Sequence, residues 1–207
     1  MNEEMKIPNI SMEEFVKTLP TEEEVNKSRQ EHLMEVRKRQ LDVIMPKAFQ
    51  ETEKSRLLKK QLTDACNWAR HCYESKLNLC LAGETGVGKT RTAWEAIKVR
   101  FLFHGGEPFA IGAETFTRRL FREPHLMDKV CNAPLLLLDD LGKEKTTPTA
   151  ESAIFEVIRE RMDNKMPTIY TTNFSPKTLT LGFQQSETGE AVARRLKESC
   201  QVIVYGV

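Results

Sequence analysis

Hydrophobic residues along most of the chain form short runs, which alternate with longer stretches in which apolar positions recur at helical spacing. The short runs are typical of strands and lie at residues 77–82, 109–112, 135–139, 168–172 and 202–205. The longer stretches predict amphipathic helices at residues 58–73, 90–103, 113–122, 149–164 and 190–199. Strands and helices in alternation indicate an α/β fold, in which a parallel sheet has helices on both faces.

The first fifty residues differ from this pattern, because they are dense in charge and contain neither Gly nor Trp. They hold two helix-start signals, in which a hydroxyl residue precedes a glutamate by three positions. These signals are Ser11 with Glu14 and Thr21 with Glu24. From Thr21 to about Ile44 the spacing is helical, but the apolar stripe among Glu, Lys and Arg is thin. The stripe consists of Val25, Leu33, Val36 and Leu41.

A helix with so thin a stripe gains little free energy by packing on its own domain. It is either a solvated arm or an element that docks on a partner, and we favour the docking role. We therefore expect a helical N-terminal arm at residues 1–45 that binds a partner, and an α/β domain at residues 46–207.

Composition narrows the function classes. The 31 basic and 30 acidic residues give a net charge of +1, so no global field draws the chain to nucleic acid or anionic membrane. The 5 cysteines are scattered without a Cys-x-x-Cys pair, which argues against a zinc ribbon or a redox motif. The N-terminus is charged, and no run of about 18 apolar residues occurs, so we expect a soluble, cytoplasmic protein.

A glycine-rich loop with the spacing Gly-x4-Gly-Lys-Thr follows the first apolar run. It consists of Gly83, Glu84, Thr85, Gly86, Val87, Gly88, Lys89 and Thr90. Such a loop lets backbone N–H groups converge on phosphate oxygens, and the helix after it points the positive end of its dipole at them. Lys89 is placed to neutralise the β- and γ-phosphates, and the Thr90 hydroxyl is placed to ligate Mg²⁺. The sequence therefore predicts ATP and Mg²⁺ binding, in an ATPase or an ATP-driven switch.

Two aspartates emerge from the most apolar strand, whose four leucines predict burial on both faces. Ligands of parallel sheets bind at the carboxyl ends of the strands, where Asp139 would hold Mg²⁺ directly or through water. Asp140 is placed to orient or deprotonate the attacking water. Alternatively, the pair merely ends a strand before Gly142, an interpretation that the phosphate loop disfavours.

Polar residues also follow the later strands. Asn173 closes the run at 168–172, and its amide can hydrogen-bond both the γ-phosphate and the lytic water, or it can simply end the strand. Arg194 and Arg195 precede the last strand, where an arginine can reach a neighbouring subunit's nucleotide or remain a solvated surface residue.

Taken in order, these pieces resemble the AAA+ ATPases of the DnaC/DnaI helicase-loader and IstB group. The resemblance covers roughly residues 44–207 and is carried by the phosphate loop, Leu-Leu-Leu-Leu-Asp-Asp-Leu-Gly at 135–142, Pro-Thr-Ile-Tyr-Thr-Thr-Asn at 167–173, and Arg195-Leu196 before Val202-Ile203-Val204. It implies a P-loop NTPase with a five-stranded parallel AAA+ sheet. Because the sequence stops at Val207, after the fifth strand, we expect no C-terminal helical lid.

The resemblance also implies residue roles. Lys89 and Thr90 match Walker A, Asp139 and Asp140 match Walker B, and Asn173 matches sensor 1. Arg195, or less surely Arg194, matches the arginine finger. Asp140 stands where glutamate is common in AAA+ enzymes, so hydrolysis is expected to be slow and to depend on DNA and self-assembly.

Single-stranded DNA is the ligand that proteins of this group usually share. The candidate patch here is Arg118, Arg119 and Arg122, with Phe116 or Phe121 to stack on a base. We place Arg118 and Arg122 on one helical face, four residues apart. The alternative is that both phenylalanines pack in the core and the arginines are merely exposed.

Three functions fit these features. The first is an ATP-regulated loader that assembles on single-stranded DNA and delivers a replicative helicase held by the arm. The second is an adaptor whose ATP occupancy only sets its conformation, with negligible turnover. The third is an IstB-like transposition helper, which would act on duplex DNA and recruit a transposase. The sequence favours the loader, encoded by a bacterial cell or a phage.

Overall fold

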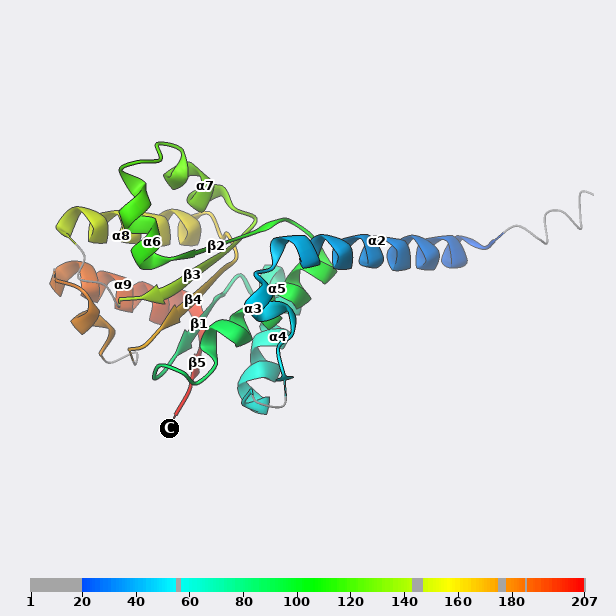
Figure 1. The fold of residues 1–207 in the computed structure, drawn as a ribbon, viewed down its shortest axis with the longest axis horizontal. Helices are drawn as coiled ribbons and strands as arrows, with labels where there is room; N and C mark the ends of the chain where they lie inside the picture. The colour runs from blue at the N-terminus through cyan, green and yellow to red at the C-terminus, as the bar shows by residue number, and fades with distance from the viewer. Residues whose placement is uncertain (1–19, 55–56, 143–146, 175–177, 185, 207) are drawn as a thin grey trace, which may run out of the picture.

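A computed structural model describes residues 20–206, apart from 55–56, 143–146, 175–177 and 185. The strands are β1 (Asn78–Ala82), β2 (Pro108–Gly112), β3 (Leu135–Leu141), β4 (Thr168–Thr172) and β5 (Cys200–Val204). The larger helices are α2 (Glu22–Ile44), α4 (Lys59–Ser75), α5 (Lys89–His104), α6 (Ala113–Leu120), α8 (Pro148–Asp163) and α9 (Ser186–Ser199). Shorter elements are α3 (Lys47–Gln50), α7 (Leu126–Asn132) and the 3-10 turn η2 (Leu179–Gly182). Figure 1 shows their arrangement.

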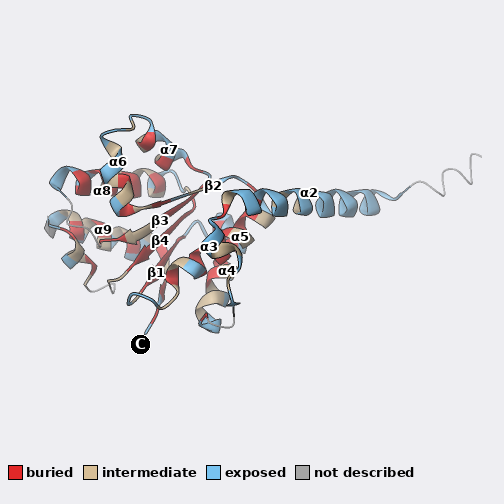
Figure 2. Cartoon of the chain, in the orientation of Figure 1, coloured by how far each residue is buried: buried red, intermediate tan, exposed pale blue. Residues whose placement is uncertain are grey.

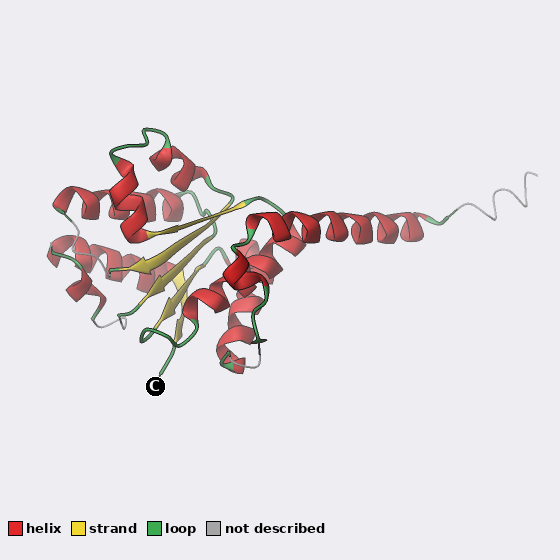
Figure 3. Cartoon of the chain, in the orientation of Figure 1, coloured by secondary structure: helices red, strands yellow, loops and turns green. Residues whose placement is uncertain are grey.

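The strands form one parallel sheet in the order β2-β3-β4-β1-β5, with helices packed against both of its faces (Figure 3). Because all strands run the same way, β1, β3 and β4 deliver the residues that follow them to one edge of the sheet. This is the five-stranded parallel sheet that the sequence predicts.

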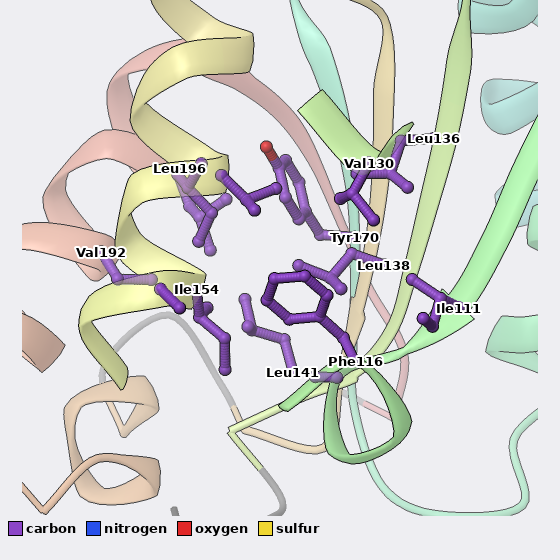
Figure 4. Packing of buried hydrophobic residues seen from close by; sticks show 14 of the residues in the cluster. Ile111, Phe116, Val130, Leu136, Leu138, Leu141, Ile154, Tyr170, Val192 and Leu196 are labelled. Atoms are coloured by element: carbon purple, nitrogen blue, oxygen red, sulfur yellow. The ribbon is translucent and has the colours of Figure 1, made fainter. Parts of the chain in front are cut away.

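The leucines of β3 show why the sheet needs helices on both faces. Successive strand residues point to opposite sides, so Leu136 and Leu138 join one apolar cluster and Leu135 and Leu137 join the other. The first cluster is completed by α6, α7, α8 and α9 and includes Phe116 and Tyr170 (Figure 4). The second is completed by α4 and α5. Side chains of β3 on the second side therefore point toward α5.

The helix at the N-terminal end of the described chain is α2, which extends away from the body and is largely exposed (Figures 1 and 2). It begins at the predicted capping box, where the Glu24 amide donates to the Thr21 hydroxyl and the Thr21 amide donates to the Glu24 carboxylate. Leu41 alone of its residues is buried. Within residues 20–206, outside the gaps given above, no helix is long and apolar enough to cross a membrane. The other predicted box, Ser11 with Glu14, lies outside the described residues.

Candidate nucleotide site

The phosphate loop turns from β1 into α5. Gly88 precedes α5 with a φ of 93°, a left-handed conformation that glycine adopts without steric cost. At Gly83 an added Cβ would lie 2.7 Å from the Cβ of Tyr205, so only glycine lets the end of the chain lie against the loop. The helix begins at Lys89, one residue before the predicted start.

Lys89 is held by oxygens of the loop and of the neighbouring strand. Its Nζ donates to the carbonyls of Gly83 at 2.8 Å and Glu84 at 2.7 Å, and to Asn173 Oδ1 at 3.0 Å. The side chain is buried, which costs an ammonium group free energy unless oxygens replace its water. Two predicted residues, 84 positions apart in the sequence, are thus in direct contact.

Asp139 connects the helix after the loop to β4. Its Oδ1 accepts a 3.0 Å hydrogen bond from the Thr90 hydroxyl and a 2.5 Å bond from the Thr171 hydroxyl. Burial raises the pKa of the Asp139 carboxyl, although the hydrogen bonds from Thr171 and Thr90 act in the opposite direction. A cation placed beside this carboxylate would favour its ionised form.

The donor set beside Asp139 fits a magnesium ion. A hydroxyl and a carboxylate are hard oxygen ligands, and Mg²⁺ at such sites is usually held by one or two carboxylates together with phosphates and water. Among the residues that the structure describes, no group of three or more His, Cys, Asp or Glu could hold a metal. Phosphate oxygens and water would supply the remaining ligands of an ion at this place.

Asp140 has an unusual backbone. Its φ is 59°, in the left-handed region, which aspartate tolerates better than most residues with a Cβ. Its amide donates to the Thr171 hydroxyl at 2.8 Å. Sequence reasoning passed over Thr171, because a threonine inside a strand is ordinary and only the pairing of β3 with β4 brings it to both aspartates.

The two candidate finger residues differ. Arg195 forms an ion pair with Asp163 at 3.4 Å, and its guanidinium lies 5.6 Å from the centre of the Phe155 ring, so it is bound to its own α8. Arg194 is exposed. Both lie on α9, which follows β4 and Asn173 in the chain.

The predicted DNA patch needs correction. Phe116 is fully buried in the core and cannot stack on a base. The helix α6 ends at Leu120, so Arg122 lies in the hydrogen-bonded turn after it and not within the helix. Arg119 is paired with Glu123 at 2.6 Å. Phe121 is 71% exposed and is the aromatic residue of the patch that remains accessible.

The chain is similar to several known proteins. A family model described as IstB-like ATP binding protein matches residues 3–206. The replicative helicase loader DnaI of Bacillus subtilis (strain 168) is 31% identical over 134 residues, which are 61% of this chain and 43% of that protein. The match thus spans less than half of that relative's length.

Solved structures give the same fold. A crystal structure of DnaI has a TM-score of 0.65 at 21% identity, covering 77% of this chain and 94% of that chain. A crystal structure of the DnaC helicase loader has a TM-score of 0.61 at 25% identity, covering 72% and 93%. The replication initiator DnaA bound to AMPPCP and single-stranded DNA has a TM-score of 0.56 at 15% identity, covering 72% and 45%.

Proposed function

Because the chain belongs to the family of IstB-like ATP-binding proteins, with the AAA+ fold of the DnaI and DnaC loaders, we propose that it is an ATP-regulated helicase loader. In this role it binds Mg²⁺ and ATP, assembles on single-stranded DNA and delivers a replicative helicase. The observation that carries the nucleotide part is the contact of Lys89 with Asn173 and of Thr90 with Asp139 at one edge of the sheet.

The nucleotide phosphates lie over the loop from Gly83 to Thr90. Lys89 exchanges its carbonyl and amide acceptors for phosphate oxygens and neutralises their charge. Thr90 and Asp139 hold Mg²⁺, which when bound neutralises phosphate charge. Asp140 orients or deprotonates the attacking water, and the Asn173 amide, released from Lys89, hydrogen-bonds the γ-phosphate and that water.

Hydrolysis in this proposal needs a second subunit. An arginine of α9 reaches the γ-phosphate bound to a neighbour, where it stabilises the charge of the transition state. Arg194 is the exposed candidate, while Arg195 must leave Asp163 and Phe155 to take the role.

Mixed subunits test this assignment. An arginine variant of α9, Arg194→Ala or Arg195→Ala, is mixed with Lys89→Ala, since each defect lies on a different side of a shared site. Turnover in the mixture should exceed that of either variant alone for the arginine that acts across the interface. If neither arginine variant is complemented, the finger assignment is wrong.

The arm at residues 1–45 docks on the helicase in this proposal. Leu41 of the apolar stripe is buried, but Val25, Leu33 and Val36 are exposed, as is Val43, and these exposed residues support the role. At 100° per residue these positions lie within one quadrant of the helix. Part of the stripe lines a groove of about 590 Å³ between α2 and the end of α5.

Charge substitutions in the full chain test the arm. Leu33→Asp with Val36→Asp should abolish co-purification with a replicative helicase while ATP affinity stays unchanged. Lys38→Asp is the matched control, because it adds the same charge on the opposite side of α2. Helicase binding by the double variant, or its loss in the control as well, would exclude the stripe as the docking surface.

Single-stranded DNA binds in this proposal beside Phe121, with Arg118 and Arg122 as phosphate contacts. Replacing Phe121 by alanine should weaken binding of single-stranded DNA by about tenfold, since stacking on one base contributes about 1–3 kcal/mol. Anisotropy with a labelled oligonucleotide measures this change. Equal binding by wild type and Phe121→Ala would place the DNA contact elsewhere.

A transposition helper is the second candidate, and the IstB description of the matching family model favours it. It predicts capture of a transposase, and preference for duplex over single-stranded DNA. An adaptor without turnover remains the alternative for the ATP site, because Asp140 has a shorter side chain than glutamate. Wild-type turnover no higher than that of Asp140→Asn, with or without single-stranded DNA, would support the adaptor.

A further inference from the structure

We propose that Thr171 is a positioning residue for the ATP site, which fixes both aspartates at the end of β3 through one hydroxyl group. This inference rests on the proposed function of that site as a place for ATP and Mg²⁺. Thr171 itself touches neither nucleotide nor metal in this account. It acts through Asp139 and Asp140.

The pairing of β3 with β4 creates the need for such a residue. Leu138 pairs with Tyr170 and Leu141 pairs with Thr172, with a register shift between them. Two residues of β3, Asp139 and Asp140, therefore lie opposite the single residue Thr171. This is the arrangement of a β-bulge, which disrupts the ladder locally and turns a side chain in a new direction.

The bulge leaves backbone groups without their usual ladder partners. Asp140 has a positive φ, and its amide points to the side chain of β4 and donates to Thr171 Oγ1 at 2.8 Å. The threonine hydroxyl thus supplies the acceptor that a regular ladder would take from the backbone. Without it, the left-handed turn that presents Asp140 at the sheet edge loses a hydrogen bond.

The direction of the bonds is set by the chemistry of the groups. An amide only donates, so Thr171 Oγ1 accepts from Asp140 and its one hydrogen is left for Asp139 Oδ1, at 2.5 Å. The chain of bonds therefore runs from Asp140 N–H through the hydroxyl to the Asp139 carboxylate. Both aspartates are tied to one atom of a fully buried side chain.

The two threonines hold the Asp139 carboxylate differently. Thr171 binds Oδ1 alone, whereas the Thr90 hydroxyl lies between the two oxygens, at 3.0 Å from Oδ1 and 3.3 Å from Oδ2. When the Thr90 hydroxyl turns its oxygen to a cation, Asp139 keeps its orientation through Thr171. Partners of this kind around a metal ligand typically change metal affinity or activity by about 10–100-fold when removed.

The adjacent threonine provides a matched control. Thr172 is also buried on β4, but its hydroxyl donates to the Leu141 carbonyl at 2.8 Å and accepts from the Phe174 amide. It supports the backbone and makes no bond to either aspartate among the contacts of the described chain. Thr171→Val and Thr172→Val each remove one buried hydroxyl with little change in shape.

The test compares wild type with Thr171→Val, Thr171→Ser and Thr172→Val as full chains. Calorimetric titration gives ATP affinity in EDTA and across a Mg²⁺ series, turnover gives kcat and KM, and thermal melting reports on folding. In Thr171→Val we expect unchanged ATP affinity in EDTA, a Mg²⁺ midpoint raised about tenfold, and kcat lowered about tenfold with little change in KM. Thr171→Ser should restore both, because it keeps the hydroxyl.

The outcomes separate the inference from the function it rests on. A Mg²⁺ midpoint and kcat in Thr171→Val equal to those of wild type would overturn the inference alone. An equal Mg²⁺ effect in Thr172→Val would also overturn it, because loss of any buried hydroxyl would then explain the weaker Mg²⁺ binding. Failure of Thr171→Ser to restore Mg²⁺ binding would overturn it as well. If wild type binds no ATP, both the proposed function and the inference are wrong. Melting temperatures lowered alike in both valine variants, with the Mg²⁺ defect confined to Thr171→Val, support the positioning role.

Discussion

The phosphate edge of the sheet and the helix α2 differ in how their residues are fixed. At the phosphate edge, Lys89, Asp139 and Thr171 each contact groups from at least one other element through hydrogen bonds of 2.5–3.0 Å. On α2, the long-range anchors are the buried Leu41 and Arg37, whose guanidinium donates to the Leu102 carbonyl at 2.6 Å. The side chains of the edge are therefore fixed by contacts between elements, whereas most side chains of α2 are exposed.

The largest contrast in folding stability should come from leucines in the two regions. Leu137→Ala empties space between β3 and α5, and we expect the free energy of unfolding to fall by about 2–5 kcal/mol. Leu33→Ala on α2 should change it by less than about 0.5 kcal/mol, because that side chain is exposed. Urea denaturation measures both. Similar losses of folding free energy in the two variants would show that Leu33 of α2 is packed against the rest of the protein.

The segment between the two regions should show a smaller effect. Glu95 of α5 is buried and binds Lys98 at 2.7 Å and Lys54 at 3.2 Å, and Lys98 also donates to the Gln50 carbonyl. Replacing Glu95 by glutamine should lower the free energy of unfolding by about 1–2 kcal/mol. Amide exchange should quicken in residues 45–54 and not in β3. Uniform quickening across the sheet would contradict a local anchoring role.

The smallest effect concerns pH at the start of α2. The backbone hydrogen bond from Thr21, followed by its side-chain bond, lowers the pKa of the exposed Glu24 carboxyl below its ordinary value of 4.5. A depressed folded pKa means that the contribution is present above about pH 4.5 and is lost as pH falls through the lower, folded value. Amide exchange at residues 21–25 should quicken on acidification in wild type, and Thr21→Ala should remove this pH dependence. An unaltered pH dependence in the variant would contradict the capping role.

The sequence predicts the sheet and the phosphate edge well, because local signals and the fold agree there. The first four residues of β3 are all leucine, as a strand buried on both faces requires. The glycines of the loop are needed for a left-handed backbone or for a close contact. The Thr21 capping box is likewise local, since both of its bonds lie within one turn.

Other features depend on tertiary contacts that spacing does not reveal. The helical spacing around Phe116 is compatible with an exposed or a buried side chain. Phe116 is buried because it packs against β3 and α8. Pro124 indicates that α6 ends nearby, but its last residue, Leu120, cannot be located from spacing alone. Thr171 acquires its partners through a shift in strand register, and Arg195 through contacts with α8.

Calorimetric titration of the full chain with ATP and Mg²⁺, beside Lys89→Ala, tests the central claim most directly. Wild type should bind ATP, and loss of the Lys89 ammonium should weaken binding by about a hundredfold, because charge-assisted hydrogen bonds to phosphate contribute about 1.5–3 kcal/mol each. Lys59→Ala, an exposed lysine of α4, should bind as wild type does. No binding by wild type, or equal binding by Lys89→Ala, would contradict the assignment of the phosphate edge as the nucleotide site.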